Sequence, residues 1–383
     1  MKLVIAQSNL TLKGGAEKVV LEIARHYNAK ILTAEYDRKS TFEEFGDLDI
    51  EVIGKTFFTK LLPYGRASQG LGYGLGFYFN RIAGDYDVIN AHVAPSHWIR
   101  NRNERVLWYC HTPLRDAYDL YGYRMSMQKP LRRPMYAFGI MGIRAIDRSV
   151  IGRIEGILAN SSNTKRRIER YLGRRDVEEL NPAVHYELFG NNGDEKFFFY
   201  PSRFSPNKRQ DYAIRAFHIF KSKYRKGNYK LILMGALSKD KFYSDYYEKI
   251  VRMAGSVGGV EIMSRPDNTT EEMWREFMSR STAVLYPPLD EDFGIVPLEA
   301  MASGKPIIAV NQGGPRETIV DKKTGYLVDS EERMAEVMNF VVEHPKVMEG
   351  IGKEGQQRVR RGYSWERFFR VFDRKLDEVK EKS

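Results

Sequence analysis

The sequence predicts an α/β protein with two doubly wound domains, each built on a parallel sheet covered by helices. Short apolar runs alternate with helical patterns along the chain, which is typical of parallel sheets buried on both faces. These runs form two series with an irregular stretch between them. The length of 383 residues exceeds one typical domain and fits two.

In the first series, each apolar run ends in polar or small residues and leads toward a helical segment. Strands are expected at residues 2–7, 87–92, 105–110 and 156–162, and helices at 16–27 and 164–173. The opening run, "KLVIAQ", is short and ends at once in polar residues. It therefore predicts a first strand and not a signal peptide.

The second series begins after residues 180–196, where Pro182 and several Asn and Gly residues interrupt any periodicity. Strands are expected at residues 197–204, 230–236, 282–288, 306–314 and 324–329, with helices at 210–224 and 334–345. The predicted domains are therefore 1–182 and 183–360. Residues 361–383 form an amphipathic helix capped by Ser364, which we expect to pack back on the first domain.

Composition narrows the class of protein. Hydrophobic residues make up 42% of the chain, enough for real cores. The single cysteine, Cys110, excludes an internal disulfide and favours a reducing, cytoplasmic location. No stretch approaches the roughly 18–20 apolar residues that span a bilayer, so a soluble or peripheral protein is expected.

The net charge of +11 requires a partner or a solvated basic surface, and both readings stay open. Roughly +8 of the excess precedes His185. Nucleic acid, anionic membrane and phosphorylated ligands would each suit this charge. Nucleic acid is disfavoured because the chain has no zinc-ligand spacing, no aromatic RNA-binding signature and no convincing recognition helix.

Candidate ligand residues follow predicted strands, where backbone N–H groups and helix N-termini can hold anions. Gly14 and Gly15 lie between the first strand and a helix, although a plain turn would also use them. The pattern is neither G-x-G-x-x-G nor a Walker motif, which argues against dinucleotide oxidoreductases and P-loop enzymes. His92 and His111 each end a strand and could equally be hydrogen-bonded structural residues.

Two further groups follow strands of the second domain. Arg203, Lys208 and Arg209 could neutralise a diphosphate, the alternative being a solvated basic loop. Glu291 lies in a loop beyond a strand and Glu299 in the early turns of a helix, so each carboxylate could accept hydrogen bonds from vicinal sugar hydroxyls. The alternative for this second group is an ordinary tight turn.

The segment "EDFGIVPLEAMASGKPIIAV", followed by "GGPRETI" and "TGYLV", closely resembles the donor-site signature of retaining glycosyltransferases of family four, which have the GT-B fold. "GGAEKVV", "NSSNTKRRI", "NPAV" and "SRFSPNKRQDYAIRAF" match that family's pattern in order, so the resemblance covers essentially the whole chain. "YCHTPLRDAYD" looks most like enzymes that use GDP-mannose. The resemblance implies two facing Rossmann-like domains with a cleft between them.

The resemblance also implies roles. Glu299 would hold ribose hydroxyls, Glu291 the donor hexose, and Arg203 with Lys208 the departing diphosphate. Gly15 would approach the phosphates through its backbone, and His111 would orient the sugar or steady developing charge. The remaining implied donor-binding residues are Gly14, Asp292, Phe293, Gly294, Ile295 and Val296. Asp292 and Arg209 stand where the family commonly has glycine.

The implied reaction moves a hexose, with mannose from GDP-mannose the closest match, to a glycan or a lipid-linked saccharide with retention of configuration. Front-face attack by the acceptor hydroxyl is the family expectation. Fixed cations and backbone dipoles stabilise the departing diphosphate, so no metal or cofactor is expected. "DYD" at residues 85–87 is read as a surface turn and not as a metal-binding Asp-x-Asp.

Other functions stay in competition. A UDP-sugar-dependent glycosyltransferase and a non-transferring GT-B enzyme such as a sugar-nucleotide epimerase are the runners-up. A dinucleotide oxidoreductase or a nucleic-acid binder comes last. We expect the acceptor on the first domain, where residues 70–79 and 129–144 combine apolar and basic character. They could dock at the cytoplasmic face of an anionic membrane, or form a core helix and a solvated face.

Overall fold

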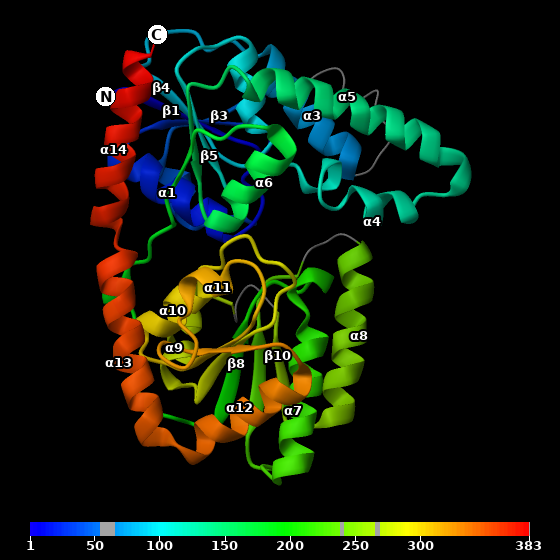
Figure 1. Ribbon diagram of the computed structural model, residues 1–383, viewed down its shortest axis with the longest axis vertical. Coiled ribbons are helices and arrows are strands. Elements are labelled where there is room, and N and C mark those ends of the chain that lie inside the picture. Colours follow the sequence, from blue (N-terminus) through cyan, green and yellow to red (C-terminus); the bar gives the residue numbers. More distant parts are fainter. Residues whose placement is uncertain (54–65, 238–240, 265–268, 383) are drawn as a thin grey trace. The chain divides into compact units, whose positions relative to one another are not determined.

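The computed structural model describes residues 1–53, 66–237, 241–264 and 269–382. The chain divides into two compact units (Figure 1). Unit 1 comprises Met1–Asn181 and Phe369–Ser383, and unit 2 comprises Pro182–Phe368. Each unit is an α/β domain around one parallel sheet, which confirms the predicted fold class.

Unit 1 contains a seven-stranded sheet in the order β3-β2-β1-β4-β5-β6-β7, and its paired strands are all parallel. Its strands are β1 (Leu3–Gln7), β2 (Lys30–Thr33), β3 (Ile50–Val52), β4 (Val88–Ala91), β5 (Val106–Cys110), β6 (Gly156–Ala159) and β7 (Val177–Glu179). Its helices include α1 (Gly15–Tyr27), α3 (Arg66–Phe79), α4 (Tyr121–Ser126), α5 (Arg133–Ile151) and α6 (Ser162–Leu172). The strand order reverses between β1 and β4, which makes that position the switch point of the sheet.

Unit 2 contains a six-stranded parallel sheet in the order β10-β9-β8-β11-β12-β13, with its switch point between β8 and β11. Its strands are β8 (Phe197–Pro201), β9 (Lys230–Met234), β10 (Val260–Met263), β11 (Ala283–Tyr286), β12 (Ile307–Val310) and β13 (Tyr326–Val328). Its helices are α7 (Gln210–Tyr224), α8 (Lys241–Val257), α9 (Glu271–Arg280), α10 (Val296–Ala302), α11 (Pro315–Thr318), α12 (Glu331–Glu343) and α13 (Pro345–Gly362).

The cores consist of strands that are buried on both faces. All residues of β5 and of β8 are buried, as expected for central strands of covered parallel sheets. Burial of such continuous apolar runs supplies the main stabilising free energy, at about 25 cal/mol per Å² of apolar surface. The rigid strands therefore fix the positions of the loops at their carboxyl ends.

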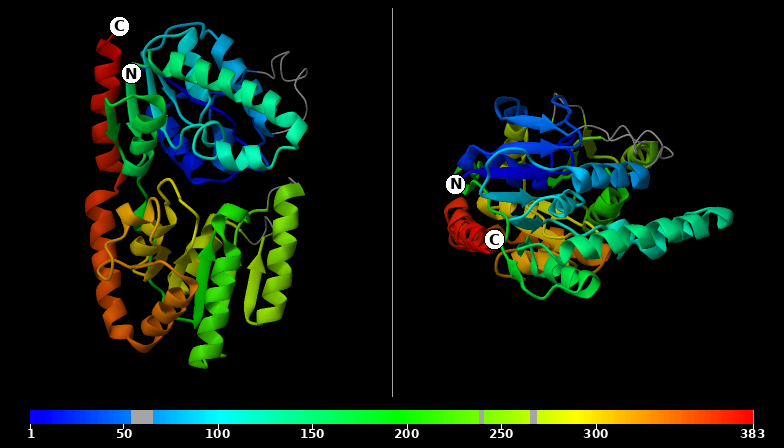
Figure 2. Two further views of the ribbon diagram at one scale, coloured as in Figure 1. Left: turned by 45° about the vertical axis from the view of Figure 1, so that its right-hand side comes forward. Right: turned by 90° about the horizontal axis from the view of Figure 1, so that it is seen from above.

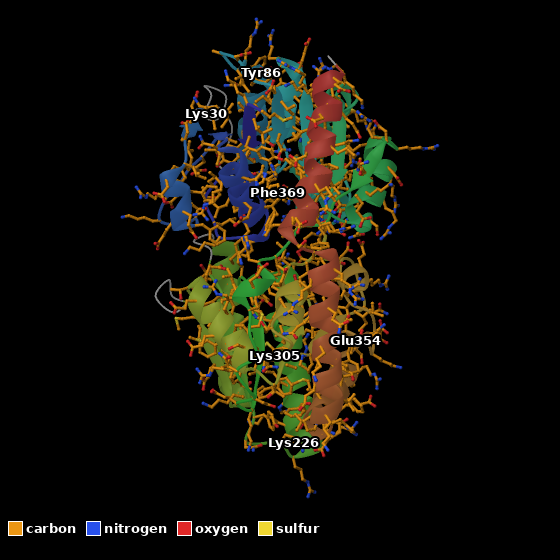
Figure 3. The ribbon with its side chains drawn as sticks, turned by 90° about the vertical axis from the view of Figure 1, so that its left-hand side faces the viewer. Lys30, Tyr86, Lys226, Lys305, Glu354 and Phe369 are labelled. Carbon is orange, nitrogen blue, oxygen red and sulfur yellow. The ribbon has the colours of Figure 1, made fainter. Side chains whose placement is uncertain are left out.

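The last helix, α14 (Trp365–Glu381), begins in unit 2 and continues into unit 1. Ser364 caps it as predicted, since its side-chain oxygen accepts from the backbone N–H of Arg367 at 3.3 Å. Figure 3 labels Phe369 on α14. Its ring stacks on His26 of α1, with ring centroids 3.7 Å apart. The Tyr27 hydroxyl donates to Asp373 at 2.5 Å, so α14 is part of the core packing of unit 1.

Residues 70–79, considered above for membrane docking, belong to α3, and most of their large side chains pack inward, although Phe79 at the end of the helix is 50% exposed. Tyr73 and Phe77 are buried in the core of unit 1. A Cβ on Gly74 would lie 2.6 Å from the ring of Trp98, so glycine permits this close approach. This segment is a core helix, as the alternative reading predicted. Among the described helices, none combines the length and apolar character needed to cross a bilayer.

Candidate functional site

The first group of candidate residues lies at the switch point of unit 2. Arg203 and Lys208 follow β8, and Glu291 follows β11. These strands pair in parallel, with Ala283 beside Phe198, so their carboxyl ends open at the same edge of the sheet. This edge is where doubly wound domains bind ligands.

A lysine and a glutamate join the two loops at this edge. The Lys208 ammonium donates a hydrogen bond to the carboxylate of Glu291 and forms an ion pair with it, although 83 residues separate them. Their side chains are only 14% and 20% exposed. A second link is the 2.8 Å hydrogen bond from the Leu289 backbone N–H to the Asn207 carbonyl. The Arg203 side chain, by contrast, is exposed to solvent.

The backbone around Lys208 is held by aromatic side chains. The buried Tyr200 hydroxyl donates to the Lys208 carbonyl. Arg209 has a left-handed backbone, with φ of 53°, which costs an ordinary residue more than glycine. This geometry explains why glycine suits the position, and the Arg209 guanidinium lies 4.3 Å from the ring centroid of Tyr212, a cation–π contact that offsets part of the strain.

The double glycine of "NQGGPRE", Gly313 and Gly314, lies in close backbone contact with the loop that carries Glu291. Gly314 donates its N–H to the Glu291 carbonyl at 2.8 Å. A Cβ on Gly314 would lie 2.1 Å from the Phe293 carbonyl oxygen, and one on Gly313 would lie 2.3 Å from the Glu291 carbonyl oxygen. These glycines therefore let two backbone segments touch, and their role is to fix the loop that carries the glutamate.

The loop then enters the short helix α10. The first turn of a helix leaves N–H groups without intrahelical partners, which suits an anionic ligand near Ile295 and Val296. Gly294 has φ of 85°, and a Cβ there would meet the ring of Tyr286 at 3.0 Å. The Phe293 side chain is buried in the core, so only its backbone can face a ligand.

Glu299 lies in the first turn of α10, as predicted, and is buried with 3% of its surface exposed. Its Oε2 accepts a hydrogen bond from the indole N–H of Trp274 on α9 at 3.0 Å. Asp292, which replaces a common glycine, does not have a left-handed backbone. The substitution at that position therefore causes no backbone strain.

In unit 1, three side chains form a hydrogen-bonded chain at the ends of β4 and β5. His92 Nδ1 lies 3.0 Å from His111 Nε2, and His92 Nε2 lies 2.6 Å from Asn90 Oδ1. The amide nitrogen of Asn90 donates to the Leu107 carbonyl at 3.1 Å, so its oxygen must face His92. His92 therefore carries its proton on Nε2 and accepts at Nδ1. His111 then donates from Nε2, which leaves its Nδ1 as an acceptor.

Burial keeps both rings neutral. It lowers the pKa of His111 from 6.5 to about 3, because a charged imidazolium loses its hydration there. Burial, and then the proximity of His111, lowers the pKa of His92 well below its ordinary value. Near neutral pH, His111 is thus an uncharged hydrogen-bond acceptor, and this favours sugar orientation over stabilisation of developing negative charge.

Gly14 and Gly15 lie at the start of α1, at the same sheet edge as His92. Gly14 is the N-cap residue, and a Cβ there would lie 2.5 Å from Oε2 of Glu17. Glu17 is buried, so a carboxylate already interacts with the positive end of this helix. Asp85 and Asp87 are elsewhere: Asp87 accepts from the Lys2 backbone N–H at 2.7 Å and pairs with Lys380 at 3.0 Å.

The structure therefore brings Lys208, Glu291 and the α10 loop together in unit 2, and places His111 and Gly14 at one edge in unit 1. The sequence did not identify Trp274, Asn90 or Glu17. Only Asn90 carried a signal, a polar side chain inside the otherwise apolar run "DVINAH". The contact of Trp274 with Glu299 joins residues on different elements, α9 and α10, and has no local pattern.

Two family models divide the chain between them. Residues 13–187 match the model described as Glycosyltransferase Family 4, and residues 187–358 match Glycosyl transferases group 1. Together they span the candidate residues from Gly14 to Glu299. The chain belongs to glycosyltransferase family four. It is a glycosyltransferase with the GT-B fold, and the recognition made from its sequence motifs is confirmed.

Relatives of this glycosyltransferase include two proteins named alpha-1,3/1,6-mannosyltransferase ALG2. The one from Dictyostelium discoideum is 26% identical over 93% of this chain and 93% of its own length. The one from Mus musculus is also 26% identical, over 93% of this chain and 91% of its own. Both similarities therefore extend over nearly complete proteins.

Solved structures agree on the fold. The Anabaena protein Alr3699/HepE in complex with UDP-glucose has a TM-score of 0.74 at 16% identity, covering 98% of this chain and 99% of that one. Sucrose-phosphate synthase from Thermosynechococcus elongatus has a TM-score of 0.77 at 16% identity and covers both chains fully. At such identity these structures support the GT-B fold alone.

Proposed function

We propose that this glycosyltransferase transfers mannose from GDP-mannose to a glycan or a lipid-linked saccharide. The similarity to ALG2 mannosyltransferases along nearly the whole chain supports the choice of sugar. The Lys208–Glu291 pair at the switch point of unit 2 carries the proposal of a nucleotide-sugar donor site there. It offers a cation for the diphosphate and a carboxylate for the sugar within one hydrogen bond of each other.

In the proposed complex, the ammonium group of Lys208 pairs with the donor diphosphate and no longer with Glu291. Glu291 then loses its cationic partner and accepts hydrogen bonds from hydroxyls of the hexose. Negative charge builds on the diphosphate as the glycosidic bond breaks, and Arg203 and Lys208 stabilise that charge more in the transition state than in the ground state. The exposed Arg203 side chain can move to the ligand without losing a buried contact.

The α10 loop and Glu299 complete the proposed donor site. Backbone N–H groups of Phe293, Gly294 and Ile295, with Asp292 and Val296 beside them, line the sugar pocket. Glu299 holds the ribose hydroxyls, and Trp274 fixes the orientation of its carboxylate. Gly14 and Gly15 would approach the phosphates by their backbone, an approach that Glu17 opposes by like charge.

His111 acts in this proposal as a neutral acceptor for a hydroxyl of the transferred sugar. Asn90 and His92 are positioning residues, because they fix which nitrogen of His111 carries the proton. Transfer is proposed to retain the anomeric configuration by front-face attack and to need no metal. The proposed place of action is the cytoplasm, at the surface of a membrane that carries the acceptor.

A UDP-sugar donor is the second candidate, because the Lys208–Glu291 pair offers groups for the diphosphate and the hexose, which every nucleotide sugar carries whatever its base. An epimerase is less well supported, because His111, with a pKa of about 3, is a poor proton carrier near neutral pH.

The deciding experiment is a panel of nucleotide sugars in which nucleoside diphosphate release is measured with and without saccharide acceptors. We expect GDP-mannose to give the fastest release and the acceptor to accelerate it. Faster release of UDP from a UDP-sugar would mean that the donor is that sugar nucleotide and not GDP-mannose. Isomerised nucleotide sugar without diphosphate release would refute transfer. Proton NMR of the product tests retention, and repeating the assay with a chelator tests metal independence.

A further inference from the structure

The helix α5 of unit 1 is attached to its domain by a buried carboxylate. Asp147 accepts hydrogen bonds from His97 Nε2 at 2.7 Å and from the Trp98 indole N–H at 2.8 Å. The Tyr118 hydroxyl donates to it as well, at 2.8 Å. Breaking the hydrogen bonds of such a buried carboxylate costs free energy. They therefore fix the rotation of this end of α5 about the helix axis. The rotation decides which face of the helix points outward.

The face that points outward is apolar. Leu131, just before α5, is 94% exposed, and Met135, Phe138 and Met141 are 68%, 74% and 60% exposed. Their spacing places them on one side of the helix. We call these four residues the outer face. Figure 2 shows α5 extending beyond the sheet of its own unit. Tyr123 of the neighbouring α4 and Met127, which directly follows α4, are also exposed.

An apolar patch of this kind is uncommon on a surface that only meets water, so it indicates a binding site. Elsewhere in unit 1, α3 turns Tyr73 and Phe77 into the core and exposes a single large apolar residue among its described side chains, Phe79 at its last position. The outer face of α5 is therefore not a general feature of the helices around this sheet. Met135 and Met141 are flexible and polarisable, which suits contact with a fluid or irregular partner.

The net charge around the outer face is positive. Between Tyr121 and Gly152 the sequence has six basic residues and a single acidic one, Asp147, which is buried. Exposed basic side chains that border the outer face are Lys129, Arg132, Arg133 and Arg148. Arg124 is neutralised, since it pairs with Asp116 at 2.8 Å.

We propose that the outer face of α5 inserts into the interface of an anionic bilayer, with the bordering basic residues on the lipid phosphates. A helix with an apolar face and a basic border lies in the plane of such an interface. A second copy of the chain is a poorer occupant, because two such basic borders would repel. The proposal goes beyond the donor chemistry and would bring unit 1 to a lipid-linked acceptor.

Vesicle co-sedimentation of the full chain tests this. We expect binding to vesicles containing phosphatidylglycerol, weaker binding at high salt, and none to phosphatidylcholine alone. An outer-face variant with Leu131→Ser, Met135→Ser, Phe138→Ser and Met141→Ser should bind at least tenfold more weakly. A charge variant with Lys129→Gln, Arg132→Gln, Arg133→Gln and Arg148→Gln should lose about fivefold for each residue replaced.

The matched controls lie on unit 2. Leu188→Ser with Val347→Ser removes exposed apolar side chains, and Lys346→Gln with Lys353→Gln removes exposed charges. Both controls should bind as the wild type does, and thermal unfolding should show that all variants fold. Wild-type binding by the outer-face variant, or no binding by the wild type, would overturn the proposal. So would a concentration-dependent dimer in solution that the outer-face substitutions abolish.

A single-site probe gives a second readout. The only cysteine, Cys110, is buried, so Phe138→Cys can be labelled selectively with an environment-sensitive fluorophore. Its emission should shift to shorter wavelength on anionic vesicles, whereas the same label at Val347→Cys should not respond. An equal response at both positions would mean non-specific adsorption and would contradict a docking face on α5. Neither readout depends on turnover, so a failed donor assignment would not affect them.

Discussion

Lys208 and Glu291 meet across the point where the strand order of the second sheet reverses. Each follows one of the two strands that flank this point, β8 and β11. The pair therefore marks where the ends of separate chain segments converge, and it brings opposite charges to the ligand-binding edge of the domain.

Replacing Lys208 by alanine should lower the rate of diphosphate release by about 10²–10³-fold, because a preorganised cation for the leaving group is lost. Glu291→Ala should also lower it, and the double variant should lose less than the product of both effects because the two side chains interact. Steady-state assays with each variant measure this. Lys226→Ala breaks another lysine–glutamate pair of unit 2, with Glu343, and should leave turnover unchanged. Independent, fully multiplicative effects at Lys208 and Glu291 would contradict the shared role.

The lowered pKa of His111 predicts how the stability of the fold depends on pH. The folded pKa of His111, about 3, lies below its ordinary value of 6.5, so the unfolded chain binds more protons between these values. Stability is therefore fully present above about pH 6.5 and is lost as pH falls toward 3, by about 1.4 kcal/mol per pH unit for this group. Urea unfolding across this range should show a shallower loss for His111→Asn. An unchanged slope would mean that His111 is charged in the fold.

The hydrogen bonds that join Asn90, His92 and His111 also predict how activity depends on pH and what a substitution of Asn90 does. The rate of transfer should neither rise nor fall near pH 6.5, the ordinary pKa of histidine, because His111 stays neutral there. Asn90→Asp puts a carboxylate beside His92 and favours a charged ring, so it should make the rate change with pH in this range. A pH profile identical to that of the wild type would exclude a positioning role for Asn90.

Trp274→Phe should raise the KM for the donor about tenfold and leave kcat close to the wild-type value. It removes the indole N–H that orients Glu299, a hydrogen bond to a buried carboxylate, without touching the leaving-group cations. Trp98→Phe is a matched control, because it removes an indole hydrogen bond to Asp147 in unit 1. That variant should lose stability with an unchanged donor KM. Equal KM values for both variants would refute the role of Trp274.

Gly314→Ala should destabilise unit 2 by about 1–3 kcal/mol and reduce turnover, because its methyl group would collide with the Phe293 carbonyl and displace the Glu291 loop. Gly350→Ala lies on α13 with open space around the added methyl group. It should stabilise the protein by about 0.5–1 kcal/mol through helix propensity. Thermal unfolding of both variants checks these opposite signs, and stabilisation by Gly314→Ala would contradict the close backbone contact.

The sequence predicted the central strands well because they are continuous apolar runs. "RVLWYC" and "FFFYPSRF" became β5 and β8, both buried throughout. Four strands were not predicted. The edge strands β3, β7 and β10 carry exposed glutamates, and β2, which lies between β1 and β3, is short and follows a helix directly. Such edge strands resemble loops in composition, so only pairing with neighbouring strands reveals them.

The candidate site was predictable where its residues follow strands or match a family motif. Glu291, Glu299 and Lys208 were selected as candidates in this way. Their contacts were not, because Lys208 meets Glu291, and Trp274 meets Glu299, only after the sheet forms. The double glycine at Gly313 and Gly314 illustrates the same limit. It looks like a turn or a phosphate-binding loop in sequence, whereas in the structure it lets the Glu291 loop lie against its neighbour.

The most direct test of the donor site is a crystal structure of the protein with bound GDP-mannose. We predict the diphosphate within hydrogen-bonding distance of Lys208 and Arg203, the ribose at Glu299 and the Lys208–Glu291 ion pair broken. A diphosphate bound away from the carboxyl ends of β8 and β11, with the ion pair intact, would contradict it.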